Sequence, residues 1–145
     1  MSEASGEIAA LFRDYQAAYG EPDPAAAIAD FFVFPCLITA DAEPVALTPF
    51  ASRQDCINTM SRFLKLYERI GAARAETLSL TVAPVSATLC TAMLGLAICN
   101  AAGERLYAFD AHYTLVRRDG AWRIAAIAHN EMPYLLARVA AIRAA

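Results

Sequence analysis

The chain has 145 residues, a formal net charge of -3 and a hydrophobic content of 58%. This length fits one domain, 1–145, and an apolar share above the usual value of about 45–50% predicts a large core with apolar surface left for a pocket or a partner. The positive charges are scattered and form no basic stripe, which argues against a nucleic acid partner. No apolar run reaches the roughly 20 residues of a membrane helix, and no basic-apolar leader opens the chain, so we expect a cytoplasmic protein that binds no membrane.

Three helices are predicted in the first half of the chain. The first spans residues 8–19, and the second opens at Asp23-Pro24, where the aspartate is the N-cap and the proline takes the first helical position. The third begins with Ser52 as its N-cap and ends at Gly71, a residue type that favours helix ends.

Strands are predicted on both sides of the third helix. A short hairpin is expected over residues 34–38 and 45–47, before that helix. From Thr77 onward the chain is typical of long strands, because apolar and polar residues alternate. Residues 86–99 are apolar at both parities, which predicts a strand covered on both faces.

The last part of the chain predicts a hairpin followed by a short helix or tail. Asp119-Gly120 is a strong signal for a two-residue turn, and it joins strands expected over residues 104–117 and 122–128. Residues 134–143 are expected to form the short helix or tail.

No motif indicates a metal or a phosphate group. None of the four cysteines forms a C-x-x-C pair, no H-E-x-x-H occurs, and the glycines are isolated. We therefore expect no metal and no cofactor, and we expect the cysteines to be small buried hydrophobes: Cys36, Cys56, Cys90 and Cys99.

Two segments carry a family resemblance: FFVFPCLIT at residues 31–39 and YTLVRRDGAWRIA at residues 113–125. Together with the element order, they resemble the nuclear transport factor 2-like superfamily, and within it the polyketide cyclase-like (SnoaL-like) branch. The resemblance covers residues 8–130 and is most specific at the hairpin that carries Arg118-Asp119-Gly120-Ala121-Trp122.

The resemblance implies an α+β fold in which a strongly curved, mixed or antiparallel sheet wraps as a cone around the three helices of the N-terminal half. It also implies an apolar cavity at the open end and, in many members, a homodimer formed through the outer face of the sheet. Members include ketosteroid isomerases, scytalone dehydratase, polyketide cyclases and subunits without catalysis, so the fold alone does not decide function.

Asp110, His112 and His129 are the candidate catalytic cluster. A two-residue loop at Asp119-Gly120 places Asp110 opposite His129 and puts both histidines on one face of the sheet, where the carboxylate could orient an imidazole for acid-base work. A bulge would change which face each residue shows. In the alternative, these three residues face solvent or a dimer interface, where their polar side chains only form hydrogen bonds with one another and have no catalytic role.

The resemblance adds three further expectations about individual residues. Scytalone dehydratase-like members carry a histidine near the position of His112, whereas ketosteroid isomerases carry a protonated aspartic acid there. The isomerase pattern also needs a general-base aspartate in the early hairpin, near Asp41. A tyrosine from the first helix, Tyr15 here, can point into the cavity as a hydrogen-bond donor, although simple core packing is the alternative.

The remaining candidates are apolar or aromatic residues expected to line the cavity, with ordinary core packing as the alternative: Tyr19, Phe32, Phe34, Met60, Phe63, Tyr67 and Trp122. With the polar cluster, they suggest a small apolar ligand and, as one hypothesis, a cofactor-free isomerase, dehydratase or cyclase. A non-catalytic ligand-binding module and a dimeric interaction module are the alternatives.

Overall fold

The computed structural model describes residues 3–144, which form an α+β fold with one six-stranded sheet. The elements are α1 (Glu3–Ala18), α2 (Pro24–Ala29), β1 (Phe32–Ala40), β2 (Ala46–Phe50), α3 (Arg53–Ile70), β3 (Ala72–Ser86), β4 (Leu89–Asn100), β5 (Arg105–Arg118), β6 (Ala121–His129) and α4 (Glu131–Ala144). The strand order is β2-β1-β6-β5-β4-β3, with β1 parallel to β6 and every other neighbouring pair antiparallel. The predicted fold class, with three helices in the N-terminal half, is confirmed.

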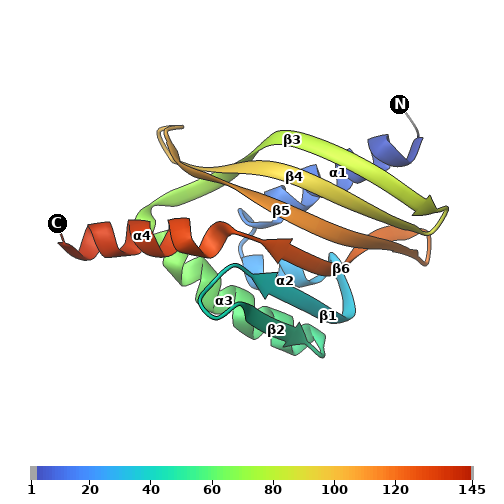
Figure 1. Cartoon of the computed structure of the whole chain (residues 1–145), viewed down its shortest axis with the longest axis horizontal. Helices are drawn as coiled ribbons and strands as arrows, with labels where there is room; N and C mark the ends of the chain where they lie inside the picture. The colour runs from blue at the N-terminus through green and yellow to red at the C-terminus, as the bar shows by residue number, and fades with distance from the viewer. Residues whose placement is uncertain (1–2, 145) are drawn as a thin grey trace.

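The long strands β3, β4 and β5 curve over α1, and α3 lies beside β1 and β2 (Figure 1). α4 leaves the end of β6 and runs away from the body of the sheet, and its first part contacts β5 and α3. The sheet is therefore open, and its concave face lies toward the helices. None of the helices in residues 3–144 combines the length and the apolar character that a membrane crossing requires.

Local sequence signals fix the ends of α3. The side-chain oxygen of Ser52 accepts a hydrogen bond from the backbone N–H of Asp55 at 3.2 Å, and Asp55 accepts in return from the N–H of Ala51 at 3.1 Å. Gly71 ends the helix in the left-handed region at φ 73°. β3 then begins at Ala72, five positions earlier than the start predicted at Thr77, because the chain turns directly from helix to strand.

The hairpin between β5 and β6 has the predicted two-residue turn but not the predicted register. Arg118 pairs with Ala121 around the turn, whereas farther along Thr114 pairs with Ala126 and Leu115 with Ile124. Ala125 therefore has no partner across the ladder, and this bulge shifts every later pair by one residue.

The shift moves the two histidines to opposite faces of the sheet. His129 lies opposite Ala111, on the face toward the helices, and His112 lies opposite Ala128, on the outer face. The predicted pairing of Asp110 with His129 is therefore wrong, and its physical cause is the bulge at Ala125.

The core lies between the concave face of the sheet and α1, α2 and α3. Side chains of one parity along β5 are buried there, and they include Tyr107, Phe109, Tyr113 and Leu115. The ring of Phe12 on α1 packs edge-on against Tyr113, with centroids 4.7 Å apart.

β4 is covered on both faces over only part of its length. Ala97 and Cys99 are buried on the outer face, but Thr91 and Met93 are exposed there, and 47% of Met93 is accessible. Within residues 3–144, the two-sided cover predicted for residues 86–99 is therefore not formed over the first half of this strand.

Candidate functional site

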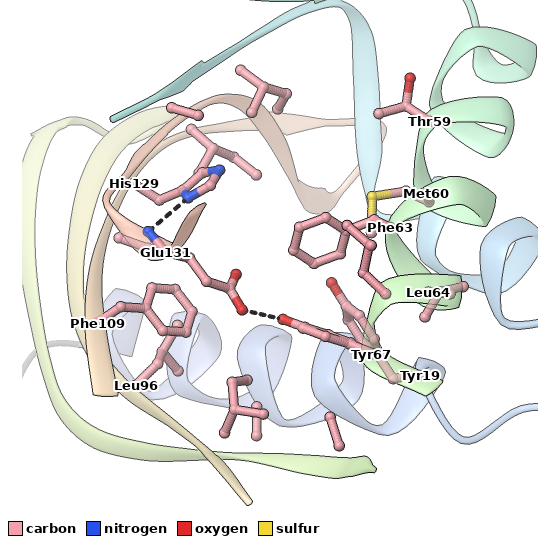
Figure 2. Close-up of a pocket in the computed structure, with 18 of the residues that line it drawn as sticks. Tyr19, Thr59, Met60, Phe63, Leu64, Tyr67, Leu96, Phe109, His129 and Glu131 are labelled. Atoms are coloured by element: carbon pink, nitrogen blue, oxygen red, sulfur yellow. Dashed lines mark hydrogen bonds between the residues drawn. The ribbon is translucent and has the colours of Figure 1, made fainter. Parts of the chain in front are cut away.

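A cavity of about 660 Å³ lies between the concave face of the sheet and α3, with α1 along one side. Figure 2 shows Leu96 and Phe109 facing it from the sheet, and Met60 and Phe63 facing it from α3. Most of its lining is apolar, and the aromatic members are Phe12, Tyr15, Tyr19, Phe32, Phe50, Phe63, Tyr67, Phe109 and Tyr113. This volume falls within the range of about 300–1,000 Å³ that is usual for small-molecule sites.

Glu131, the first residue of α4, places a carboxyl group in this apolar surrounding. The residue is only 4% exposed and is the one buried charged or polar residue of the described core. Its Oε2 accepts two hydrogen bonds, from the hydroxyl of Tyr67 at 2.5 Å and from that of Tyr107 at 2.7 Å. The bond from Tyr67 crosses between the sheet side and α3 (Figure 2).

The other carboxyl oxygen, Oε1, is open to the cavity. It makes no hydrogen bond within residues 3–144, yet no fully buried side-chain oxygen or nitrogen in that range lacks a partner, so Oε1 retains accessible surface. Figure 2 shows this oxygen on the side of the carboxyl group that faces the hollow. Because Oε2 already accepts two hydroxyl protons, a proton bound by Glu131 resides on Oε1, where a ligand can reach it.

Burial raises the pKa of Glu131 from 4.5 to about 7, although the hydrogen bonds from Tyr67 and Tyr107 act in the opposite direction. The N-terminal end of α4 also favours the charged form, since the helix dipole is positive there. In this apolar site, the loss of hydration raises the pKa by more than the two hydrogen bonds and the helix dipole lower it. Glu131 therefore changes its protonation state near neutral pH, where a general acid or base works best.

His129 is the second polar group on this wall, and its protonation is fixed by the backbone. Its Nδ1 accepts a hydrogen bond from the N–H of Glu131 at 3.2 Å, so the neutral ring carries its proton on Nε2. Burial lowers the pKa of His129, which also favours the neutral ring. His129 consequently offers an Nε2–H donor to the cavity that it lines.

Tyrosine hydroxyls supply the remaining polar atoms. The hydroxyls of Tyr15 and Tyr19 lie 3.3 Å apart, and Tyr113 lines the same space. Burial raises the pKa of all three phenols well above their usual value, so they stay protonated and act as hydrogen-bond donors. Within residues 3–144, no three acidic, histidine or cysteine side chains gather in a way that could hold a metal ion.

The structure brings most of the sequence-predicted lining residues together. Tyr15 and His129 line the cavity, and so do Tyr19, Phe32, Met60, Phe63 and Tyr67. Phe34 and Trp122 do not: Phe34 packs against the core away from the cavity, and the Trp122 indole N–H donates to Glu7 on α1 at 2.8 Å. Glu7 also pairs with Arg117, whose guanidinium stacks over the Trp122 ring, so Trp122 ties α1 to the last hairpin.

The predicted cluster of Asp110, His112 and His129 is not formed. Asp110 and His112 are exposed on the outer face of the sheet, beside Gly95 and Met93 of β4, while His129 lines the cavity. Asp41, considered as a general base, is exposed in the turn after β1. The predicted catalytic roles of Asp110 and His112 therefore have no support from the cavity.

Glu131 is not among the residues that the sequence predicts for the site, because a glutamate at the end of the last predicted strand, near His129, is expected to cap the strand end or to face solvent. The sequence carries a weak signal for a buried hydrogen-bond acceptor near two tyrosines. Tyr107 has the parity of the buried residues of β5, and Tyr67 lies on the apolar stripe of the third helix, so each hydroxyl needed a buried acceptor.

Comparisons with known proteins place this fold among related ones. Residues 4–132 match the profile of the protein family described as NTF2-like protein (DUF6841). No curated protein matches the chain.

Solved structures with the same fold come from several bacteria. A protein of unknown function with a cystatin-like fold from Nostoc punctiforme superposes with a TM-score of 0.71 at 11% identity, over 90% of this chain and 92% of that one. An NTF2-like protein with a cystatin-like fold from Novosphingobium aromaticivorans gives a TM-score of 0.68 at 19% identity, over 97% and 86%. An NTF2-like protein of unknown function from Pseudomonas putida gives 0.67 at 16% identity, over 90% and 88%. At these identities the likeness concerns the fold alone.

Proposed function

The chain belongs to the NTF2-like family (DUF6841), and on that premise we propose that its cavity binds a small, mostly apolar molecule and exchanges a proton with it through Glu131. The reaction class is a cofactor-free isomerisation, dehydration or cyclisation, in which general acid-base chemistry suffices. The assignment to the polyketide cyclase-like branch stays a prediction that agrees with this reaction class.

The observation that carries the proposal is the environment of the Glu131 carboxyl group. Two tyrosine hydroxyls fix Oε2, Oε1 stays open to an apolar cavity, and burial brings the pKa to about 7. A carboxyl group poised near neutral pH can act as a general acid: Oε1 donates its proton to a carbonyl oxygen of the ligand while solvent water takes up the α-proton, and the carboxylate recovers its proton when the carbonyl group re-forms. A glutamate that only stabilised the fold would have no need of a free oxygen on the cavity side.

His129 supports the same chemistry as a neutral donor. Its Nε2–H is available to polarise a carbonyl or to stabilise negative charge that develops on an oxygen. The Tyr19 and Tyr113 hydroxyls line the same cavity as further donors. The site thus has two kinds of polar group. Oε1 of Glu131 exchanges a proton with the ligand, and the fixed hydrogen-bond donors around it do not titrate near neutral pH.

The experiment follows the exchange of carbon-bound protons for deuterium in 2-tetralone, an uncharged bicyclic ketone with acidic α-hydrogens. The protein is added to the ketone in D₂O at neutral pH, and ¹H NMR measures the rate at which the α-proton signal is lost. We expect the wild-type protein to accelerate exchange above buffer and Glu131→Gln to lose at least about 100-fold of that acceleration. Equal rates for the wild-type protein, the variant and buffer would count against acid-base chemistry at Glu131.

Ligand binding without turnover is the second candidate, and the fixed tyrosine and histidine donors favour it equally. In that case Glu131 anchors the ligand, and 2-tetralone binds without accelerated exchange. The homodimer expected through the outer face of the sheet also stays a proposal. Exposed Leu37 and Met93 on that face support it, and sedimentation equilibrium at micromolar concentration tests it.

A further inference from the structure

The wall of the cavity offers two side chains that can donate hydrogen bonds to a ligand, His129 and Glu131. His129 presents an Nε2–H, because its Nδ1 accepts the backbone N–H of Glu131. Glu131 presents an O–H on Oε1 whenever it is protonated, because both tyrosine hydroxyls donate to Oε2. A carbonyl oxygen is the ligand group that suits such a wall, since it accepts hydrogen bonds and has no proton of its own to donate.

No cationic side chain lies close enough to the Glu131 carboxyl group to form an ion pair within residues 3–144. The titratable groups that face it are all neutral donors: Tyr19 in the turn after α1, Tyr67 of α3, Tyr107 and Tyr113 of β5, and His129 of β6. The charged residues that line the cavity are exposed ones, namely Arg62, Glu68 and Arg74. An ionised Glu131 therefore remains an uncompensated negative charge in an apolar space, which is unfavourable.

We propose that the cavity selects uncharged ligands that present a carbonyl oxygen to Glu131 and His129, and that each such ligand binds together with one proton held on Oε1 of Glu131. This inference rests on the proposed function, and it names the chemical class of the ligand and the protonation state that receives it. An anionic ligand meets the carboxyl group without a counter-charge. An ammonium ligand finds one acceptor in Glu131 but meets the fixed Nε2–H donor of His129, which it cannot satisfy.

The proposal predicts that affinity follows the acid form of Glu131. Since burial raises the pKa of this carboxyl to about 7, affinity for a neutral ketone should be constant on the acid side and fall about tenfold for each pH unit above neutrality. Between pH 6 and pH 9 the loss should reach about 100-fold. Glutamine at position 131 keeps the acceptor for the tyrosines and a permanent N–H donor toward the cavity, so its affinity should not depend on pH over this range.

The test uses three probes with one bicyclic skeleton and different charges: 2-tetralone, 2-aminotetralin and 1,2,3,4-tetrahydro-2-naphthoate. Isothermal titration calorimetry measures their binding to the full chain and to Glu131→Gln from pH 6 to pH 9, in buffers of different ionisation enthalpy, which reports the protons taken up. We expect 2-tetralone to bind tightest at pH 6, with an uptake at pH 8–9 that approaches one proton in the wild-type protein and is absent in the variant. Circular dichroism and thermal melting check that the variant is folded.

Two results would overturn the proposal. The first is a wild-type affinity for 2-tetralone that is the same at pH 6 and pH 9, or no detectable binding of this ketone to the folded protein. The second is tighter binding of 2-aminotetralin than of 2-tetralone, with an affinity that rises with pH, which would identify an ammonium site. Binding is measured here without any chemical step, so proton-linked binding without deuterium exchange would contradict only the catalytic part of the proposed function.

Discussion

Tyr67 on α3 donates its hydroxyl to Oε2 of Glu131 at 2.5 Å, although 64 residues separate the two in sequence. The bond joins the helix on one side of the cavity to the segment that follows the last strand on the other. The position of the carboxyl group therefore depends on the packing of α3 against the sheet. The same contact decides which of the two carboxyl oxygens a ligand meets.

Glu131 makes the stability of the protein depend on pH in a specific direction. Its pKa is raised from 4.5 to about 7 in the folded protein, so the unfolded chain loses this proton first as pH rises. Stability due to this group is complete below pH 4.5 and is lost as pH rises through about 7, by roughly 3 kcal/mol in total. Glu131→Gln should remove this loss, as measured by urea unfolding at pH 5 and pH 8.5. Parallel pH profiles for the two proteins would show that the carboxyl ionises normally in the fold.

Removing one donor to Oε2 should raise the Glu131 pKa further. Tyr67→Phe deletes a hydrogen bond that favours the ionised carboxylate, so the free energy of unfolding should fall by about 1–3 kcal/mol above neutral pH and by less at pH 5. Tyr134→Phe is the matched control, because Tyr134 is 46% exposed and its hydroxyl bonds to no residue within 3–144. Urea unfolding at the two pH values measures both variants. An equal loss at both pH values in Tyr67→Phe would indicate packing alone.

The two histidines provide a matched pair that separates the cavity from the outer face. His129→Ala removes the Nε2–H donor and should weaken 2-tetralone binding on the order of three- to tenfold, which is the effect of one hydrogen bond. His112→Ala should leave binding unchanged and shift the free energy of unfolding by no more than about 0.5 kcal/mol, because the side chain is exposed. Calorimetry at pH 6 compares them. A larger effect at His112 would place the ligand on the outer face.

Most of the fold could be predicted because its signals are local. Ser52, Gly71 and the Asp119-Gly120 turn each act within a few residues, and each lies at the predicted element boundary. The bulge at Ala125 could not be predicted, because alanine fits a regular strand as well as a bulged one. A regular register would place His112 and His129 on the same face of the sheet. The extra residue at Ala125 places them on opposite faces.

The site was less predictable because its key contacts join distant segments. Glu131 resembles a solvated first-turn residue until Tyr67 and Tyr107 are brought against it from α3 and β5. The aromatic lining was easier to predict, because residues on the inner stripes of helices face the concave side of the sheet in this architecture. Trp122 is predicted to line the cavity together with the other aromatic residues, with core packing as the alternative. The structure supports core packing, because Trp122 is buried and its N–H donates to Glu7.

Two glycines should respond to alanine with opposite signs. Gly71 adopts φ 73°, which strains any residue with a Cβ, so Gly71→Ala should destabilise the protein by about 1 kcal/mol. Gly6 lies within α1 and has open space where the Cβ of an alanine would lie, so Gly6→Ala should stabilise the protein by about 0.5–1 kcal/mol. Urea denaturation at pH 7 gives both values. A gain at position 71 would mean that α3 ends differently.

The most direct measurement is a ¹³C NMR titration of the Glu131 side-chain carboxyl carbon in the protein without ligand, with the signal assigned by its absence in Glu131→Gln. A midpoint near pH 7 is the expected result, since burial raises the pKa of this group to about 7. A midpoint near the ordinary glutamate value of 4.5 would contradict the account, because the carboxyl group would then be hydrated and ionised at neutral pH, and it could neither hold nor exchange a proton with a ligand there.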